Sequence, residues 1–119
     1  LVTESEATVI LSVGDKEVMT VAMGNGPVNA LDDALRRALL PIYPMVEDMH
    51  LLDFKVRIMP PRAETTGTDA ITRVMIETTD GGGQRWSTLG VSPNIIDASF
   101  GALYDSITYR LYRAGVKAA

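Results

Sequence analysis

A glycine-rich turn, Gly24-Asn25-Gly26-Pro27, contains the residues whose types and spacing are best suited to ligand binding. Proline fits the first turn of a helix, where the N–H group that it lacks would have no partner. The unpaired backbone N–H groups and the positive dipole of that helix end attract an anion such as a carboxylate. Glycine also lets ligand atoms approach the backbone closely. The same residues form ordinary strand-to-helix connectors, so the turn alone supports either interpretation.

Asp53 is a candidate partner for the ammonium group of a ligand. It lies on the polar side of an alternating segment, between Leu52 and Phe54. The alternative is a solvated carboxylate that pairs with Lys55 or Arg57, because strand faces commonly carry such charge pairs. The residue types alone leave both interpretations open.

Few other residues are suited to chemistry. Tyr43 and the Leu39-Leu40 pair could form an apolar pocket for a branched side chain, although core packing is the simpler interpretation. The chain has no cysteine and one histidine, which excludes a structural zinc site, a disulfide framework and a thiol nucleophile with an imidazole base. An enzyme built on Asp53 and His50 is the weakest hypothesis, because no oriented acid–base pair is visible. We therefore predict no catalytic residue, no metal ligand and no cofactor in this chain.

Length and charge limit the function further. A chain of 119 residues is too short for a (β/α)₈ barrel, which needs about 250. A net charge of -4 argues against nucleic acid as a partner. No apolar run approaches the ~20 residues that span a bilayer, and no leader sequence is visible, so we expect a cytoplasmic protein and no membrane contact. The chain begins with Leu1 rather than Met, which suggests a fragment of a longer polypeptide.

The first part of the chain predicts a β-hairpin followed by a helix. Apolar residues alternate over Ala7–Val13, and a second strand, Val18–Met23, follows after a short turn. From Pro27 onward, one helical face carries Val28, Leu31, Leu35 and Leu39. The charged residues that fall mostly on the opposite side are Asp32, Asp33, Arg36 and Arg37. Pro41 and Pro44 are predicted to end this helix.

The second part predicts three strands and a second helix. His50–Met59 has the period of a half-buried strand, with Leu52, Phe54, Val56 and Ile58 on one face. Pro60-Pro61 and a polar loop to Asp69 precede a hairpin of Ile71–Thr78 and Arg85–Val91, in which Trp86 should reach the core. From Asn94 onward, the stripe Ile96, Ser99, Leu103, Ile107 and Leu111 indicates a helix that Gly115 ends.

The two parts look like a degenerate duplication. Each has a hairpin, a Gly-x-small-Pro turn (residues 24–27 and 90–93) and an Ala-x-x-x-Ala-Leu helix segment, with two extra residues in the second copy. We interpret the second turn as a relic of the duplication rather than a second anion site. The expected fold is one domain, an α+β two-layer sandwich with a ββα-βββα pseudo-repeat, in which the helices lie on one side of the sheets. Its halves cover about 7–44 and 50–115.

Apolar side chains on both faces of the first hairpin predict a covering partner. Val9 and Leu11 lie on one face and Ile10 on the other. A second copy of the chain is the simplest cover, because twofold dimers are the commonest oligomers. The alternative is that Ile10 is an isolated exposed apolar residue, as many surfaces contain.

Three segments carry a resemblance to a known family. They are Gly24-Asn25-Gly26-Pro27-Val28-Asn29-Ala30-Leu31, Leu52-Asp53-Phe54-Lys55-Val56-Arg57-Ile58 and Trp86-Ser87-Thr88-Leu89-Gly90-Val91-Ser92-Pro93-Asn94-Ile95-Ile96. With Gly67-Thr68 and Thr72-Arg73-Val74 between the last two, they resemble the C-terminal regulatory domain of the 2-isopropylmalate synthase and citramalate synthase family. The last two segments are closer to the citramalate branch.

The resemblance implies a parent enzyme whose N-terminal barrel uses a divalent metal to condense acetyl-CoA with a 2-oxo acid. It implies that this domain forms a homodimer, acts on the catalytic domain of the same chain, and binds isoleucine, or alternatively leucine, as a feedback inhibitor near the dimer interface. A structural homodimerisation domain without effector binding is the alternative. Phe54 departs from the tyrosine that the family more often has there. The effector residues that the resemblance implies are Gly24, Asn25, Gly26, Pro27, Val28, Tyr43, Asp53, Phe54, Val56, Ile58 and Ala70.

Overall fold

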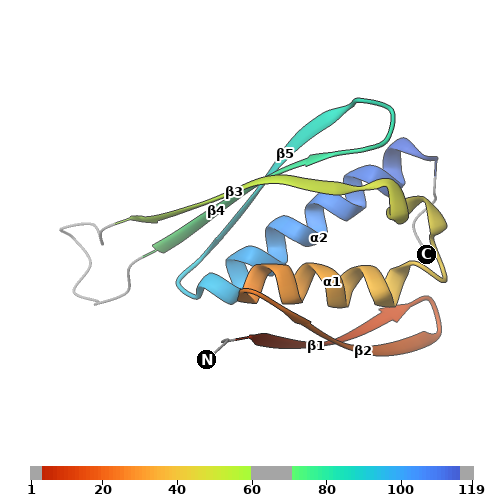
Figure 1. The fold of residues 1–119 in the computed structure, drawn as a ribbon, viewed down its shortest axis with the longest axis horizontal. Coiled ribbons are helices and arrows are strands. Elements are labelled where there is room, and N and C mark those ends of the chain that lie inside the picture. Colours follow the sequence, from red (N-terminus) through yellow and green to blue (C-terminus); the bar gives the residue numbers. More distant parts are fainter. Residues whose placement is uncertain (1–3, 60–70, 116–119) are drawn as a thin grey trace. The chain divides into compact units, whose positions relative to one another are not determined.

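The computed structural model describes residues 4–59 and 71–115 (Figure 1). The elements follow in the order β1 (Ser5–Val13), β2 (Lys16–Gly24), α1 (Pro27–Leu39), a 3-10 helix η1 (Pro44–Asp48), β3 (His50–Met59), β4 (Ile71–Thr79), β5 (Arg85–Ser92) and α2 (Ile95–Arg113). This order confirms the predicted α+β class and its ββα-βββα sequence of elements; η1 was not predicted. Pro60-Pro61, the polar loop after it, Gly67-Thr68 and Ala70 lie outside the described residues.

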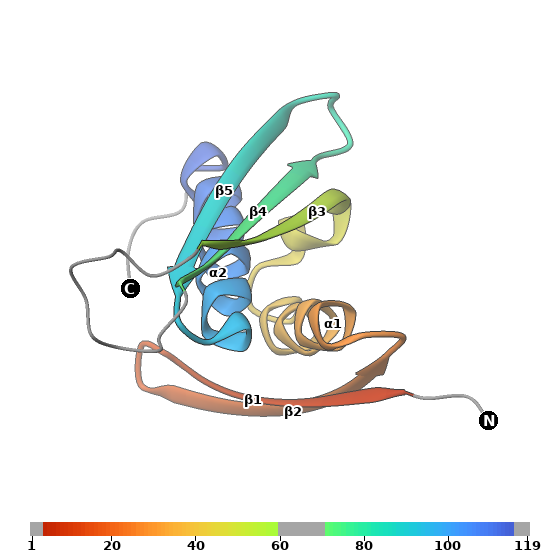
Figure 2. The same ribbon diagram turned by 90° about the vertical axis from the view of Figure 1, so that its left-hand side faces the viewer.

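The chain divides into two compact units, Leu1–Asp48 with Tyr109–Ala119, and Met49–Thr108. In the first unit β1 and β2 form an antiparallel hairpin, and α1 packs on both strands (Figure 2). Thr20 donates a 2.6 Å hydrogen bond from its hydroxyl to the carbonyl oxygen of Ala34. The buried residues of α1 are Val28, Ala30, Leu31, Ala34, Leu35, Ala38 and Leu39. The predicted apolar helix face is therefore confirmed.

The charged side of α1 differs from the prediction. The side chains of Asp32 and Arg36 are only 20% and 22% exposed, and Arg36 Nε lies 3.1 Å from Asp32 Oδ2. Arg37 and Asp33 form the corresponding pair one residue later and are more exposed. Spacing four apart favours both pairs. Helical periodicity placed the four charged residues mostly opposite the apolar face, but it predicted neither their pairing nor the burial of the first pair.

In the second unit β3, β4 and β5 form an antiparallel sheet with β4 in the centre. Hydrogen bonds attach α2 to this sheet: Thr88 donates to the Ala102 carbonyl at 2.8 Å, and Trp86 Nε1 donates to Ser106 Oγ at 3.1 Å. Trp86 is buried, as predicted. Gly115 has a φ of +82°, and its N–H bonds the carbonyl of Tyr112, so it ends α2 as expected.

Two burial predictions for the second unit are wrong. Strand β3 was expected to be half-buried, yet none of its residues is buried, and Ile58 is 69% exposed. β3 is an edge strand, whereas the buried Val74 and Ile76 are on the central strand. Ile96 was placed on the buried stripe of the helix but is 44% exposed. The buried residues of this part of the helix are the small Ala98, Ser99 and Ala102.

The two units share one strand-to-helix spacing, which differs from the predicted alignment of the two halves. The bonds from Thr20 to Ala34 and from Thr88 to Ala102 each span 14 residues, so strand and helix match without an insertion. Gly26 precedes α1 as Asn94 precedes α2. The predicted two extra residues arose from matching glycines by type, whereas Gly90 lies inside β5 rather than in a turn.

Candidate functional site

The N-terminus of α1 is open to solvent-borne groups. Gly26 precedes Pro27 with φ -157° and ψ 169°, and no side chain among the described residues caps this helix end. A Cβ built on Gly26 would meet no heavy atom within 4 Å. Because this backbone is extended, a side chain at Gly26 causes no strain. No side chain among the described residues therefore bonds the N–H groups of the first turn, and open space lies beside Gly26.

The N-terminus of α2 is capped by its own side chains. Asn94 Oδ1 accepts hydrogen bonds from the N–H groups of Ile96 at 2.7 Å and Asp97 at 3.3 Å. Ser92 Oγ accepts a further bond from the Asn94 N–H at 3.1 Å. This side-chain cap occupies the N–H groups that an anion would need. The start of α2 therefore differs from that of α1, where no side chain among the described residues bonds the N–H groups.

Gly24 has a packing role that Gly26 lacks. A Cβ on Gly24 would lie 2.7 Å from the backbone nitrogen of Ala30 and 3.0 Å from the carbonyl carbon of Asn29. These are backbone atoms, which cannot rotate away. Gly24 therefore allows the end of β2 to approach the first turn of α1, whereas Gly26 borders free space.

Tyr43 lies beyond the other end of α1. Its N–H donates a 2.7 Å hydrogen bond to the carbonyl of Leu39, and its own carbonyl accepts from Val46. Its side chain is half-buried. The 13 residues of α1 separate Tyr43 from the Gly26 turn by about 20 Å. Within the first unit, one amino acid cannot contact both.

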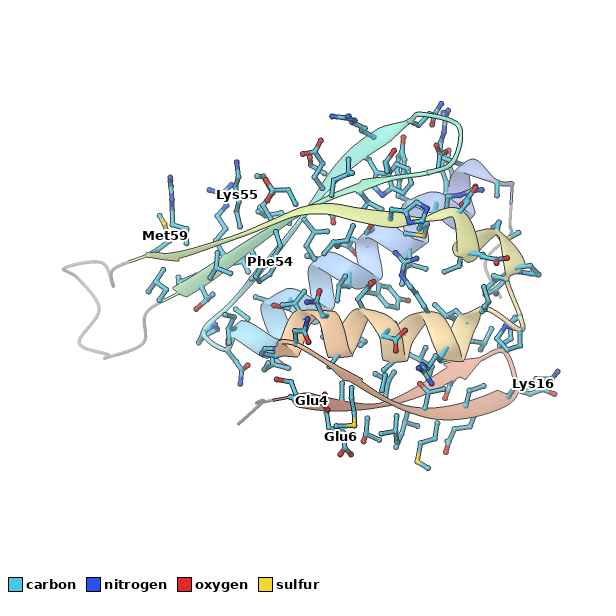
Figure 3. The ribbon with its side chains drawn as sticks, viewed as in Figure 1. Glu4, Glu6, Lys16, Phe54, Lys55 and Met59 are labelled. Carbon is cyan, nitrogen blue, oxygen red and sulfur yellow. The ribbon has the colours of Figure 1, made fainter. Side chains whose placement is uncertain are left out.

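The predicted site residues of β3 fall on two faces. One face of β3 carries Phe54, Val56 and Ile58. Their cross-strand partners on β4 are Ile76, Val74 and Thr72, in that order. Lys55 leaves the strand on the side opposite to Phe54 (Figure 3). Asp53 shares the Lys55 face, so its carboxylate does not lie with the apolar trio.

Asp53 is exposed and already has partners. Lys55 Nζ lies 3.8 Å from Asp53 Oδ2, and Asp53 Oδ1 accepts a 2.8 Å bond from the Phe54 N–H. This is the solvated, paired carboxylate of the alternative interpretation. The structure groups Gly24–Val28 in the first unit and Phe54, Val56 and Ile58 on one face of β3 in the second. Ala70 lies outside the described residues.

The face of the second sheet that carries Lys55 has a hollow that the sequence did not predict. Its volume is about 560 Å³. The residues that line it are Lys55, Val56, Arg57, Arg73, Met75 and Leu89. Arg73 received no role from the sequence, because only the register between β3 and β4 places it directly opposite Arg57.

Burial perturbs the carboxyl group of Asp32. It raises the pKa of Asp32 above its ordinary value, although the neighbouring Arg36 guanidinium opposes the shift. The described residues contain no cluster of histidine, cysteine, aspartate and glutamate suited to a metal ion. No helix within the described ranges is long and apolar enough to cross a membrane.

Comparison with known proteins identifies relatives along nearly the whole chain. The family model of the LeuA allosteric (dimerisation) domain matches residues 2–111. The (R)-citramalate synthase of Geobacter sulfurreducens is 51% identical over 110 residues, which cover 92% of this chain and 20% of that protein. The (R)-citramalate synthase of Streptomyces coelicolor is 50% identical over 115 residues, 97% of this chain and 21% of that protein.

A more distant relative is named for a different activity. The 2-isopropylmalate synthase of Dictyoglomus turgidum is 32% identical over 93 residues, 78% of this chain and 16% of that protein. The chain spans about a fifth of the length of the curated relatives it matches. The family match covers far more than half of the chain. This chain therefore belongs to the LeuA allosteric (dimerisation) domain family.

Proposed function

We propose that the chain is an amino-acid sensor that mediates feedback inhibition of a citramalate synthase of which it forms a part. The observation that carries this proposal is the open N-terminus of α1 beside Gly26, in a chain whose family is described as allosteric. The carboxylate of an amino acid is the anion that such a helix end accepts. The Gly24–Val28 turn supplies the N–H groups for that carboxylate.

Isoleucine is the effector that we favour over leucine. The (R)-citramalate synthases are about 50% identical to this chain, whereas the 2-isopropylmalate synthase is 32% identical. The effector residues that we propose are Gly24–Val28, Tyr43, Asp53, Phe54, Val56, Ile58 and Ala70. Because Tyr43 and Gly26 lie at opposite ends of α1, residues from both protomers of a homodimer would have to contribute.

The chemistry of the parent enzyme lies outside this chain. We propose a barrel that uses a divalent metal and acetyl-CoA to acylate a 2-oxo acid in a Claisen-type reaction, in the cytoplasm. The described residues offer no donor set for that metal. The regulatory chain would act on this barrel by binding its effector with different affinity in the active and inhibited states.

Calorimetric titration with isoleucine, leucine and valine tests the sensor proposal. Isoleucine should release or absorb heat and raise the unfolding temperature, because a ligand that binds only the folded state stabilises it. Valine serves as the control with the same charged groups and one methylene fewer. The absence of heat and of a thermal shift with all three at millimolar concentration would remove the sensor proposal.

A purely structural dimerisation domain is the second candidate, and one surface favours it. The face of the β1–β2 hairpin opposite α1 exposes Ile10, Met19, Val21 and Met23, with Ile10 directly opposite Met19. Ile10 is 61% exposed. A contiguous apolar patch of this kind is typical of an interaction surface. If Met19→Lys abolishes dimers in analytical ultracentrifugation while no amino acid binds the wild type, this candidate replaces the sensor.

A further inference from the structure

The outer face of the β3–β4–β5 sheet concentrates positive charge on an acidic chain. We use outer face for the side that carries Lys55, Arg57, Arg73, Met75 and Leu89, away from the buried Val74 and Ile76. The strand register also places Asp53, Glu77 and Arg85 on this side. The face thus has four cations and two carboxylates, whereas the whole chain has a net charge of -4.

The carboxylates of this face lie at one end and are already paired. Asp53 pairs with Lys55 at 3.8 Å, and Glu77 pairs with Arg85 at 3.9 Å. Arg57 and Arg73 lie farther along the sheet, directly opposite each other on β3 and β4. Among the described residues neither arginine has an ion pair. Like charges directly opposite on neighbouring strands repel each other, so this arrangement favours an anion between them.

The two arginines border a hollow with an apolar floor. Met75 and Leu89 are direct cross-strand partners and are each about two-fifths exposed. Together with Lys55 and the arginine pair they line the volume of about 560 Å³. That volume falls within the range of about 300 to 1,000 Å³ that accommodates small-molecule ligands. Guanidinium groups bind phosphate through two parallel hydrogen bonds, which a single lysine cannot do.

We propose that the outer face binds a phosphorylated ligand with a flat aromatic ring, for which a nucleoside diphosphate is the chemical prototype. Its phosphate groups bridge Arg57 and Arg73, and its ring covers Met75 and Leu89. Lys55 adds charge at the edge of the hollow. This site lies on the face opposite to Phe54 and Ile58, with Val56 as a further lining residue, and does not rest on the amino-acid site proposed above.

The test is calorimetric titration of the 119-residue chain with inorganic pyrophosphate and with ADP at an ionic strength of about 0.15 M, where the Debye length is about 8 Å. Both should bind, and ADP should bind more tightly because its ring covers the apolar floor. Arg57→Gln and Arg73→Gln should each weaken both ligands about tenfold to hundredfold, as loss of a charge-assisted hydrogen bond implies. Met75→Ser should weaken ADP and leave pyrophosphate unchanged.

Arg85→Gln is the matched control, because it removes the same charge from the same face at the end where Glu77 already pairs with it. Its effect on both ligands should be less than about twofold, as long-range charge effects are largely screened. The unliganded Arg57→Gln and Arg73→Gln variants should unfold at the wild-type temperature or higher, because each substitution removes the repulsion between the two guanidinium groups. The proposal would be overturned if Arg57→Gln and Arg85→Gln lost equal affinity for the ligands. It would also be overturned if neither ligand bound the wild type at millimolar concentration.

Discussion

Adding one methyl group at Gly90 should destabilise the fold far more than adding it at Gly26. In Gly90→Ala the new Cβ would overlap the carbonyl oxygen of Ala98 and lie 2.8 Å from its carbonyl carbon and 3.0 Å from the Ala102 nitrogen. These atoms belong to the backbone of α2, so the helix must move away from β5. That movement lengthens the 2.8 Å bond between Thr88 and the Ala102 carbonyl.

The expected magnitudes follow from those contacts. Overpacking in a well-packed core costs about 1 to 3 kcal/mol, and Gly90→Ala should reach or exceed the upper value because backbone atoms are involved. Gly24→Ala meets two close backbone atoms, at 2.7 and 3.0 Å, and should cost about 1 to 3 kcal/mol. Gly26→Ala meets nothing within 4 Å and should change the free energy of unfolding by less than ~1 kcal/mol.

Urea unfolding at one fixed protein concentration measures all three variants. The fixed concentration matters because dimer formation would make stability depend on concentration. Trp86 fluorescence reports the second unit, in which Trp86 is buried, and far-ultraviolet circular dichroism reports both units. If Gly90→Ala is as stable as Gly26→Ala, the close approach of β5 to α2 is wrong.

Two further predictions concern buried polar groups. Ser99→Ala should leave the free energy of unfolding unchanged or raise it by up to ~1 kcal/mol, because the buried Ser99 hydroxyl has no hydrogen-bond partner among the described residues. Ser106→Ala should lower the free energy of unfolding by about 1 to 3 kcal/mol, because it removes the hydrogen bonds to Trp86 and Thr78. Guanidinium chloride unfolding compares them, and a larger loss for Ser99→Ala than for Ser106→Ala would contradict the bonding scheme. Because burial raises the pKa of Asp32 above its ordinary value of 3.8, the folded state retains this proton to higher pH than the unfolded state. The resulting stabilisation is complete below pH 3.8 and is lost as the pH rises through the folded-state pKa. Asp32→Asn should flatten this part of the stability profile, and an unchanged slope in urea unfolding at several pH values would show that the burial of Asp32 has no such effect.

The secondary structure was predictable because it depends on local patterns. Alternation in Ala7–Val13 and the helical spacing from Val28 to Leu39 are properties of the segments themselves, and both elements formed. The exposure of β3 was not predictable, because it depends on which strands flank it and where α2 packs. Residues Pro44–Asp48 form a 3-10 helix too short to have a detectable period.

The candidate site was predictable only in part, for a related reason. Composition marked the glycine-rich turn, but only tertiary packing distinguishes Gly24, which faces backbone atoms, from Gly26, which faces open space. Alternation already placed Asp53 on the side opposite to Phe54. The pairing of Arg57 with Arg73 required the register between two strands, which neither segment specifies alone.

Titration of isoleucine into wild type, Gly26→Val and Gly26→Ser tests most directly whether the N-terminus of α1 is the effector site. Isoleucine at about one hundred times its Kd should stabilise the wild type by ~2.7 kcal/mol. In Gly26→Val the side chain should block the approach of the carboxylate. In Gly26→Ser the hydroxyl oxygen should accept hydrogen bonds from the free N–H groups itself. The unliganded variant should therefore be as stable as wild type or slightly more stable, and it should bind isoleucine less tightly. Wild-type affinity for isoleucine in both folded variants would contradict the account.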